Sequence, residues 1–168
     1  MNFLEQLLTE WFTYNEYFVR TNIKMKRRSK GGRDNEVDVL ADHPGKKEVI
    51  HAEPSSDAAS WDQRRKKCLE KKFVFKDEDY RQLIRGAEVT AIKKWAIVGF
   101  SQSRRVDLDW GQGIEVILIP KFMRQITDRL RDESPAKKAI PENFPILRGI
   151  QFALHFGGGR TSTQKPVW

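Results

Sequence analysis

The chain has 168 residues, the size of a single domain that can bury its own core. Its 31 lysines and arginines outnumber 23 aspartates and glutamates, and the net charge of +8 favours a polyanionic partner, nucleic acid before an anionic membrane surface. A single cysteine, Cys68, excludes a disulfide framework and a cysteine-based zinc site. Without an apolar run of roughly 20 residues or a basic N-terminal signal, we expect a soluble, cytoplasmic protein with no membrane partner.

The first predicted elements are a helix and a strand. Apolar residues recur at helical spacing over residues 2–18, which predicts an amphipathic helix. Glu10 lies next to the apolar stripe, and the pattern alone is equally compatible with a solvated helical glutamate. Apolar and polar residues then alternate over residues 19–25, which predicts the first strand.

A basic run, Lys24–Lys30, follows this strand and contains Arg27 and Arg28. Such a run is commonly a solvated hairpin tip. Because acidic residues follow within a few positions, we favour a loop that contacts phosphates.

Two apolar runs, residues 36–41 and 48–53, each carry a carboxylate and are separated by a Pro-Gly turn. They predict neighbouring antiparallel strands, because proline fixes φ and glycine accepts positive φ in the connection. Asp38 and Glu53 would then project from adjacent strands. Glu36 shares the face of Asp38 and is a third acid within reach, although at the start of the strand it is as readily solvated.

Pro54 is expected to end the third strand, and Asp57 or Ser60 to cap a helix over residues 58–73. The helix is rich in lysine and arginine, and one of its seams consists of Trp61, Arg65, Cys68 and Lys72. Lys72 is therefore expected beside the packed face. For each of the other lysines and arginines of this helix, the simplest expectation is a solvated surface residue.

The rest of the chain continues the α/β pattern within one domain. The predicted elements are a helix over 77–85 capped by Asp77, buried strands over 89–100 and 114–119, and helices over 120–131 and 142–156. The domain then divides into a core of about residues 1–120, a helical extension over about 121–156 and a loose tail over 157–168.

The order of these elements and acids resembles the PD-(D/E)XK nuclease superfamily, in its resolvase-like branch, over roughly residues 1–120. The resemblance implies a restriction endonuclease-like core, α-β-β-β-α-β, with a mixed sheet flanked by helices, to which this chain adds a C-terminal strand and helices. The family signature has an acid on the first helix, an aspartate on the second strand and Glu-x-Lys on the third. Glu10, Asp38 and Glu53 occupy the acidic positions.

The chain departs from this signature at the lysine, where Glu53-Pro54-Ser55 has a serine that carries no charge. In related nucleases another element can supply the cation. Lys72 is our first candidate, with Lys71 and Arg64 behind it, and a site that needs no lysine remains an alternative.

The resemblance implies hydrolysis of DNA phosphodiester bonds with Mg²⁺, for which Mn²⁺ would substitute. Asp38 and Glu53 would be metal ligands, together with the backbone carbonyl of Ala52. Glu10 would bind a second metal or orient a ligand water, and Lys72 would lie by the attacking water or a phosphate oxygen.

Further candidates for substrate contact are Ser55, Arg64, Arg27, Arg28 and His51. By strand alternation His51 shares the face of Glu53, so it could contact substrate or metal, although a lone histidine is more often a satisfied structural residue.

Three functions remain open at this point. The first is a metal-dependent DNA endonuclease, which the three acids favour. The second is an inactive DNA-binding module of the same fold, which Ser55 favours. The third is a structural or protein-interaction domain, in which the charge serves only solubility. Because many nucleases of this fold act as dimers, the resemblance also allows a homodimer.

Overall fold

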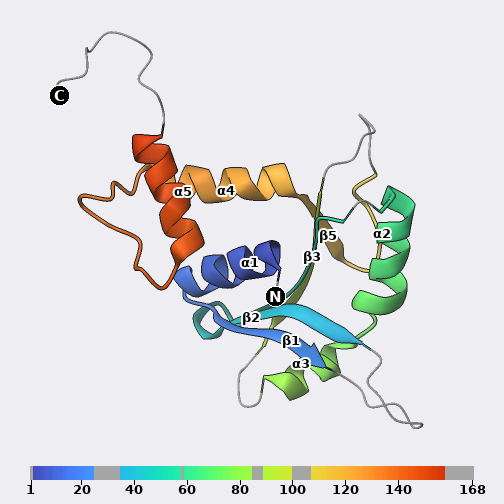
Figure 1. Cartoon of the computed structure of the whole chain (residues 1–168). Helices are drawn as coiled ribbons and strands as arrows, with labels where there is room; N and C mark the ends of the chain where they lie inside the picture. The colour runs from blue at the N-terminus through green and yellow to red at the C-terminus, as the bar shows by residue number, and fades with distance from the viewer. Residues whose placement is uncertain (1, 25–34, 58, 85–88, 100–106, 158–168) are drawn as a thin grey trace, which may run out of the picture. The chain divides into compact units, whose positions relative to one another are not determined.

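The computed structural model describes residues 2–24, 35–57, 59–84, 89–99 and 107–157 (Figure 1). The chain divides into two compact units, Met1–Phe122 and Met123–Trp168, which are described separately here. The predicted α/β class is confirmed, because helices flank a five-stranded mixed sheet. Within the described residues, no helix combines the length and apolar character needed to cross a bilayer.

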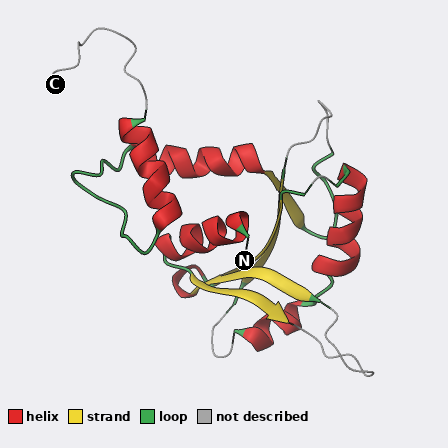
Figure 2. Ribbon diagram, viewed as in Figure 1, coloured by secondary structure: helices red, strands yellow, loops and turns green. Residues whose placement is uncertain are grey.

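The larger unit is built on the sheet whose strands are yellow in Figure 2. These strands follow the order of the chain, β1-β2-β3-β4-β5. The strands are β1 (Phe18–Lys24), β2 (Glu36–His43), β3 (Glu48–Ser55), β4 (Ala91–Val98) and β5 (Ile114–Leu118). The first three pair antiparallel, which confirms the predicted pairing of the two acid-bearing strands, whereas β3, β4 and β5 pair parallel. A short 3-10 turn, Pro44–Lys46, joins β2 to β3.

The prediction that Pro54 ends the third strand is wrong. Pro54 pairs with Ile97 of β4, whereas the ladder between β3 and β2 ends two residues before Pro54, at the pair of Val39 and Ala52. Proline has no N–H to donate, and it is tolerated in a strand where one side carries no ladder bond. The ladder between β2 and β3 therefore ends just before the two predicted carboxylates.

Helices cover both faces of this sheet (Figure 1). On one face α1 (Phe3–Tyr14) packs Phe12 against Trp95 of β4, with 5.7 Å between ring centroids. On the other face lie α2 (Trp61–Lys67), the π-helical turn η2 (Cys68–Lys72) and α3 (Asp77–Leu83). Cys68 packs in an apolar cluster with Ala96, the neighbour of Trp95. Successive strand residues point to opposite faces, so α1 and η2 lie on opposite sides of β4.

The first helix is shorter than the predicted range of residues 2–18. It begins at a capping box formed by Asn2 and Glu5 and ends at Tyr14. The chain then reverses through Glu16, whose φ of 69° breaks the helical path. Tyr17 and Phe18, at the end of the predicted helix, therefore lie outside it: Tyr17 precedes β1, and Phe18 is the first residue of β1.

In the structure, the helix predicted over residues 58–73 begins later, at Trp61, and its winding changes from α-helical to π-helical. Ser60 caps its start by accepting from the N–H of Gln63, and the regular α-helix gives way to η2 at Cys68. Arg64 is buried whereas Arg65 is exposed, so the prediction that Arg65 shares the packed seam is wrong. The wider π-helical turn changes which side chains face the sheet beyond it.

The remaining boundaries shift by a few residues. Asp77 is not the cap of α3, because the cap is Lys76, whose N–H donates to Asp79 at 2.9 Å. The strands β4 and β5 are shorter than the predicted ranges of 89–100 and 114–119. Most of the basic run Lys24–Lys30 and the tail from residue 158 lie outside the described residues.

The second unit contains most of α4 (Ile119–Arg131) and α5 (Pro145–Phe156), against predictions of 120–131 and 142–156. Gln151 of α5 is fully buried and holds the connection between these helices. Its Nε2 donates to the carbonyl of Glu133 at 2.6 Å, and its Oε1 accepts from the N–H of Ile140 at 3.0 Å. A glutamine on the apolar face thus satisfies backbone groups that would otherwise be buried without partners.

Candidate functional site

Three charged side chains from three elements meet at one point of the larger unit. Lys72 Nζ lies 2.7 Å from Asp38 Oδ1 and 2.7 Å from Glu53 Oε2. Asp38 comes from β2, Glu53 from β3 and Lys72 from the end of η2. The side chain of Glu53 is only 4% exposed, and those of Asp38 and Lys72 are 18% exposed. The structure therefore brings together three of the four residues predicted to be catalytic.

The end of the β2–β3 ladder positions the two carboxylates. Beyond the Val39–Ala52 pair, the N–H of Asp38 donates to Glu53 Oε1 at 3.1 Å. A side-chain oxygen of Glu53 thus accepts from the first N–H of β2 that lies beyond the end of the ladder. This bond holds the Glu53 carboxylate against β2, beside the side chain of Asp38.

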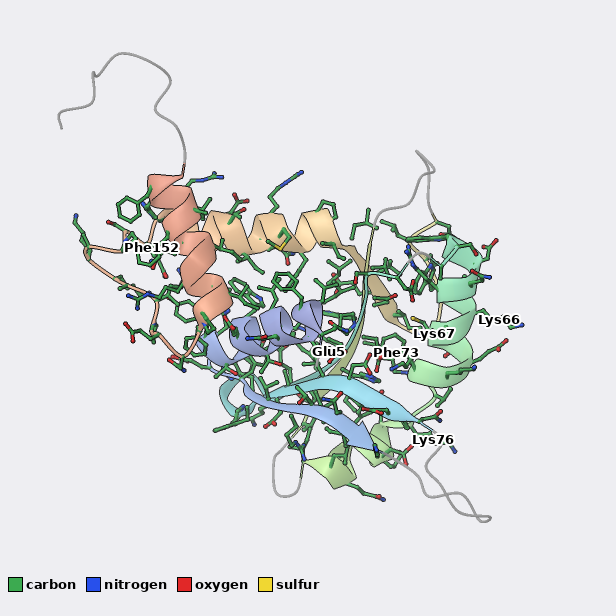
Figure 3. The ribbon with its side chains drawn as sticks, in the orientation of Figure 1. Glu5, Lys66, Lys67, Phe73, Lys76 and Phe152 are labelled. Atoms are coloured by element: carbon green, nitrogen blue, oxygen red, sulfur yellow. The ribbon has the colours of Figure 1, made fainter. Side chains whose placement is uncertain are left out.

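These side chains line a cleft that opens to solvent. Its lining residues are Asp38, Glu53, Pro54, Ser55, Arg64, Lys67, Cys68, Lys72 and Val98. Figure 3 shows Lys67 on the side of α2 that faces the sheet, and Lys66 pointing away from it. Because the side chain of Lys67 is 54% exposed, it adds a solvent-facing cation at the edge of the carboxylate site.

His51 lies behind Glu53 and does not line the cleft. It is fully buried, its Nε2 lies 2.6 Å from Glu53 Oε1, and its Nδ1 lies 2.7 Å from the hydroxyl of Tyr80. The ring packs against Phe73 at 4.7 Å between centroids. The structure therefore places His51 against the Glu53 carboxylate, apart from the residues that line the cleft.

Arg64 lines the cleft but is engaged by Asp57. Its Nε lies 3.2 Å from Asp57 Oδ1, and its Nη2 donates to the backbone carbonyl of the same residue. Burial raises the pKa of Asp57, but the nearby Ser55 hydroxyl and the Arg64 guanidinium outweigh it and lower the pKa below its usual value. Arg64 thus holds the segment between β3 and α2 in place. Ser55, the predicted substrate contact, also lines the cleft.

Glu10 is not brought to this point by the structure. It lies on α1, which covers the opposite face, and is 5% exposed. Its Oε1 accepts from Gln6 Nε2 at 3.3 Å, and it does not line the cleft. Glu36 is half-buried at the start of β2. Arg27 and Arg28 lie outside the described residues.

The carbonyl predicted for metal binding belongs to Ala52. Ala52 is fully buried and paired with Val39 of β2. The neighbour of Glu53 that lines the cleft is Pro54.

The two carboxylates carry more negative charge than Lys72 balances. Burial and the adjacent Glu53 raise the pKa of Asp38 to about 6, against the opposing effect of Lys72. Burial also raises the pKa of Glu53. Burial lowers the pKa of Lys72, but the two carboxylates outweigh it and the net pKa is raised, so the amine stays protonated. The site would therefore gain from a further positive charge.

The donor set suits a hard divalent cation held by few protein ligands. Among the described residues, no group of three or more His, Cys, Asp or Glu side chains is placed to hold a metal. Burial raises the pKa of Cys68 to about 12, so its thiol is neutral. Mg²⁺ is commonly bound by one or two carboxylates while water and phosphate oxygens complete the shell. Asp38 and Glu53 meet that requirement.

Two contacts of the site have no signal in the sequence. Tyr80 comes from α3 and reaches His51 only because that helix packs on the same sheet face. Asp57, predicted only as a helix cap, accepts from Arg64 at the edge of the cleft. Both depend on packing between elements distant in the sequence.

Comparisons of the chain with protein-family models, with curated proteins and with solved structures gave no match. The residues of this chain and their geometry are therefore the basis for assigning a function.

Proposed function

We propose that this chain is a metal-dependent endonuclease that hydrolyses phosphodiester bonds in DNA, on a restriction endonuclease-like core of the PD-(D/E)XK type. One observation carries the proposal: the Lys72 ammonium lies 2.7 Å from both Asp38 and Glu53 at the wall of an open cleft. Lys72 was selected from the sequence as the replacement for the lysine missing at Ser55. The mixed sheet and the order of the elements agree with the proposed core.

A purely structural salt bridge explains this arrangement less well. Buried ion pairs gain little over apolar packing unless every charge is balanced. Here a buried carboxylate, Glu53, and a partly buried one, Asp38, share one ammonium, and the pKa of each carboxylate is raised. Perturbed carboxylates in a cleft are typical of functional sites. The net charge of +8 agrees with a polyanionic substrate.

In the proposed mechanism Asp38 and Glu53 hold a divalent cation, Mg²⁺ or Mn²⁺. Held by these two carboxylates, such a cation would supply positive charge to the scissile phosphate and would make water a stronger nucleophile. Lys72, protonated and directed by both carboxylates, stabilises the negative charge that develops on the phosphate oxygens. Lys67, at the edge of the cleft, is suited to contact a neighbouring phosphate of the strand.

The test is nicking of supercoiled plasmid with Mg²⁺ or Mn²⁺, with the wild type compared with Asp38→Asn, Glu53→Gln and Lys72→Met. We expect each variant to lower the cleavage rate by about 100-fold or more, because each removes a charge from the reacting centre. The matched control is Lys93→Met. Lys93 also pairs with a buried glutamate of β3, Glu48, at 2.5 Å, but lies outside the cleft lining.

The Lys93→Met variant should cleave within about three-fold of the wild type, because a partly exposed ion pair contributes little. Binding of DNA without cleavage under either metal would contradict the enzyme and leave an inactive DNA-binding module. Cleavage by Lys72→Met at the wild-type rate would remove Lys72 from the mechanism.

A further inference from the structure

A buried chain of hydrogen bonds leads from α3 to the carboxylate site. The Tyr80 hydroxyl lies 2.7 Å from His51 Nδ1, and His51 Nε2 lies 2.6 Å from Glu53 Oε1. Tyr80 and His51 are both fully buried, and neither lines the cleft. The chain therefore approaches Glu53 from the side away from a substrate.

The two oxygens of Glu53 have separate partners. Oε1 accepts from the N–H of Asp38 at 3.1 Å and faces His51, whereas Oε2 lies 2.7 Å from Lys72 Nζ. A carboxylate held in this way has one oxygen fixed by backbone and histidine contacts and one directed at the Lys72 ammonium. Removing the donors to Oε1 would free the carboxylate to rotate.

A histidine is not needed here for packing alone. Its ring lies among the rings of Phe73, Phe75 and Tyr80, where an apolar side chain would pack equally well. A polar group in such surroundings is costly to bury unless it is hydrogen-bonded. Both ring nitrogens of His51 have a partner, and one of these partners is the predicted metal ligand.

We propose that His51 and Tyr80 are positioning residues of this site: Tyr80 donates to His51 Nδ1, and His51 Nε2–H donates to Glu53 Oε1, so that Oε2 faces the bound cation. The inference rests on the proposed function, because it assigns these residues to the same metal site. Outer hydrogen-bond partners that orient metal ligands typically change metal affinity or activity by about 10- to 100-fold when they are removed.

The chain offers a matched control on the other face of the sheet. The Tyr17 hydroxyl donates to Glu48 Oε1, and both residues are buried. Tyr17→Phe and Tyr80→Phe each remove one buried hydroxyl and keep the ring. Only Tyr80→Phe should alter the carboxylate site.

The first experiment measures Mn²⁺ affinity by calorimetry and kcat and KM by plasmid cleavage. Tyr80→Phe should weaken Mn²⁺ binding and lower kcat by about 10-fold at an unchanged KM for DNA, whereas Tyr17→Phe should change neither. Equal Mn²⁺ affinities for Tyr80→Phe and wild type would overturn the inference, as would equal losses in the two tyrosine variants.

A second pair of variants tests whether Tyr80 acts through His51. In His51→Gln an amide can still donate to Glu53 but is separated from Tyr80, so it should retain more Mn²⁺ affinity than His51→Leu. In the His51→Gln background, Tyr80→Phe should then have no further effect, because its route to Glu53 is gone. Additive losses in the double variant would contradict the proposed coupling.

Nitrogen NMR of the metal-free protein separates this inference from the nuclease proposal. We expect the His51 proton on Nε2, with a signal that shifts in Glu53→Gln. A proton on Nδ1 alone would overturn the inference even if the enzyme cleaves DNA. A wild type that cleaves no DNA and binds no Mn²⁺ would instead remove the proposed function and the metal-positioning role that rests on it.

Discussion

Two buried glutamates of the same strand, Glu48 and Glu53, have similar partners and different electrostatics. Glu48 is bound by the Tyr17 hydroxyl and by Lys93 at 2.5 Å. Glu53 contacts Lys72 at 2.7 Å and His51 at 2.6 Å. They lie at opposite ends of β3 and, by alternation, on opposite faces of the sheet.

Their pKa values move in opposite directions. Burial raises the pKa of Glu48, but Lys93 and Tyr17 outweigh it and hold the pKa below its usual value. Burial dominates at Glu53 and raises its pKa, because Lys72 is shared with Asp38. A balanced pair stabilises the fold, whereas two carboxylates around one ammonium favour a further cation. Charge balance, not burial, therefore separates the structural glutamate from the candidate functional one.

The largest expected effect on stability is that of Lys72→Met. It leaves the buried Glu53 and the partly buried Asp38 without their counter-charge, so we expect a loss of about 2–4 kcal/mol in the free energy of unfolding at neutral pH. Lys93→Met should cost about 1 kcal/mol or less, because Lys93 is 47% exposed and its pair is partly solvated. Urea unfolding measures both. Equal losses would mean that the two glutamates depend on their lysines to the same extent.

The second prediction concerns how much metal binding raises the free energy of unfolding. Mn²⁺ at about 100 times its Kd should raise the free energy of unfolding of the wild type by about 2.7 kcal/mol. The increase should be absent in Asp38→Asn and retained in Glu48→Gln, since only Asp38 is a proposed ligand. Thermal unfolding with and without Mn²⁺ measures the shift, and an equal rise of Tm in wild type and Asp38→Asn would exclude Asp38 as a ligand.

The smallest effect is a gain of stability in Asp38→Asn without metal. The pKa of Asp38 in the folded state is about 6, above its ordinary value. Between these two values the folded protein keeps a proton that the unfolded chain has lost, so stability falls as pH rises through this window. Asp38→Asn should remove that cost and gain about 1–2 kcal/mol at about pH 7.5.

The same gain should shrink at about pH 4.5, where the folded protein still holds the proton on Asp38. Unfolding of both proteins at the two pH values is the measurement. If the stability gained by Asp38→Asn did not depend on pH, the negative charge of Asp38 would not be what destabilises the folded state.

The carboxylate pair was predictable because it depends on local patterns. Two apolar runs around a Pro-Gly turn indicate a hairpin. Asp38 and Glu53 are then expected to project from adjacent strands. Glu10 was predicted only from its place on the first helix, and the direction of a helical side chain depends on how the helix packs. α1 covers the face opposite the cleft, so Glu10 is buried away from the two acids.

The sequence by itself determined the α/β class, the antiparallel pairing of β2 and β3 and the shared position of their acids, because these follow from periodicity and turn residues. Only the tertiary structure decided which cation meets those acids and which groups hold them. Arg64 and Lys72 lie on one basic helix, yet Arg64 binds Asp57 whereas Lys72 reaches Asp38 and Glu53. The physical reason is that the π-helical turn η2 and the packing of α3 set the directions of Lys72 and Tyr80, and neither leaves a periodic pattern in the sequence.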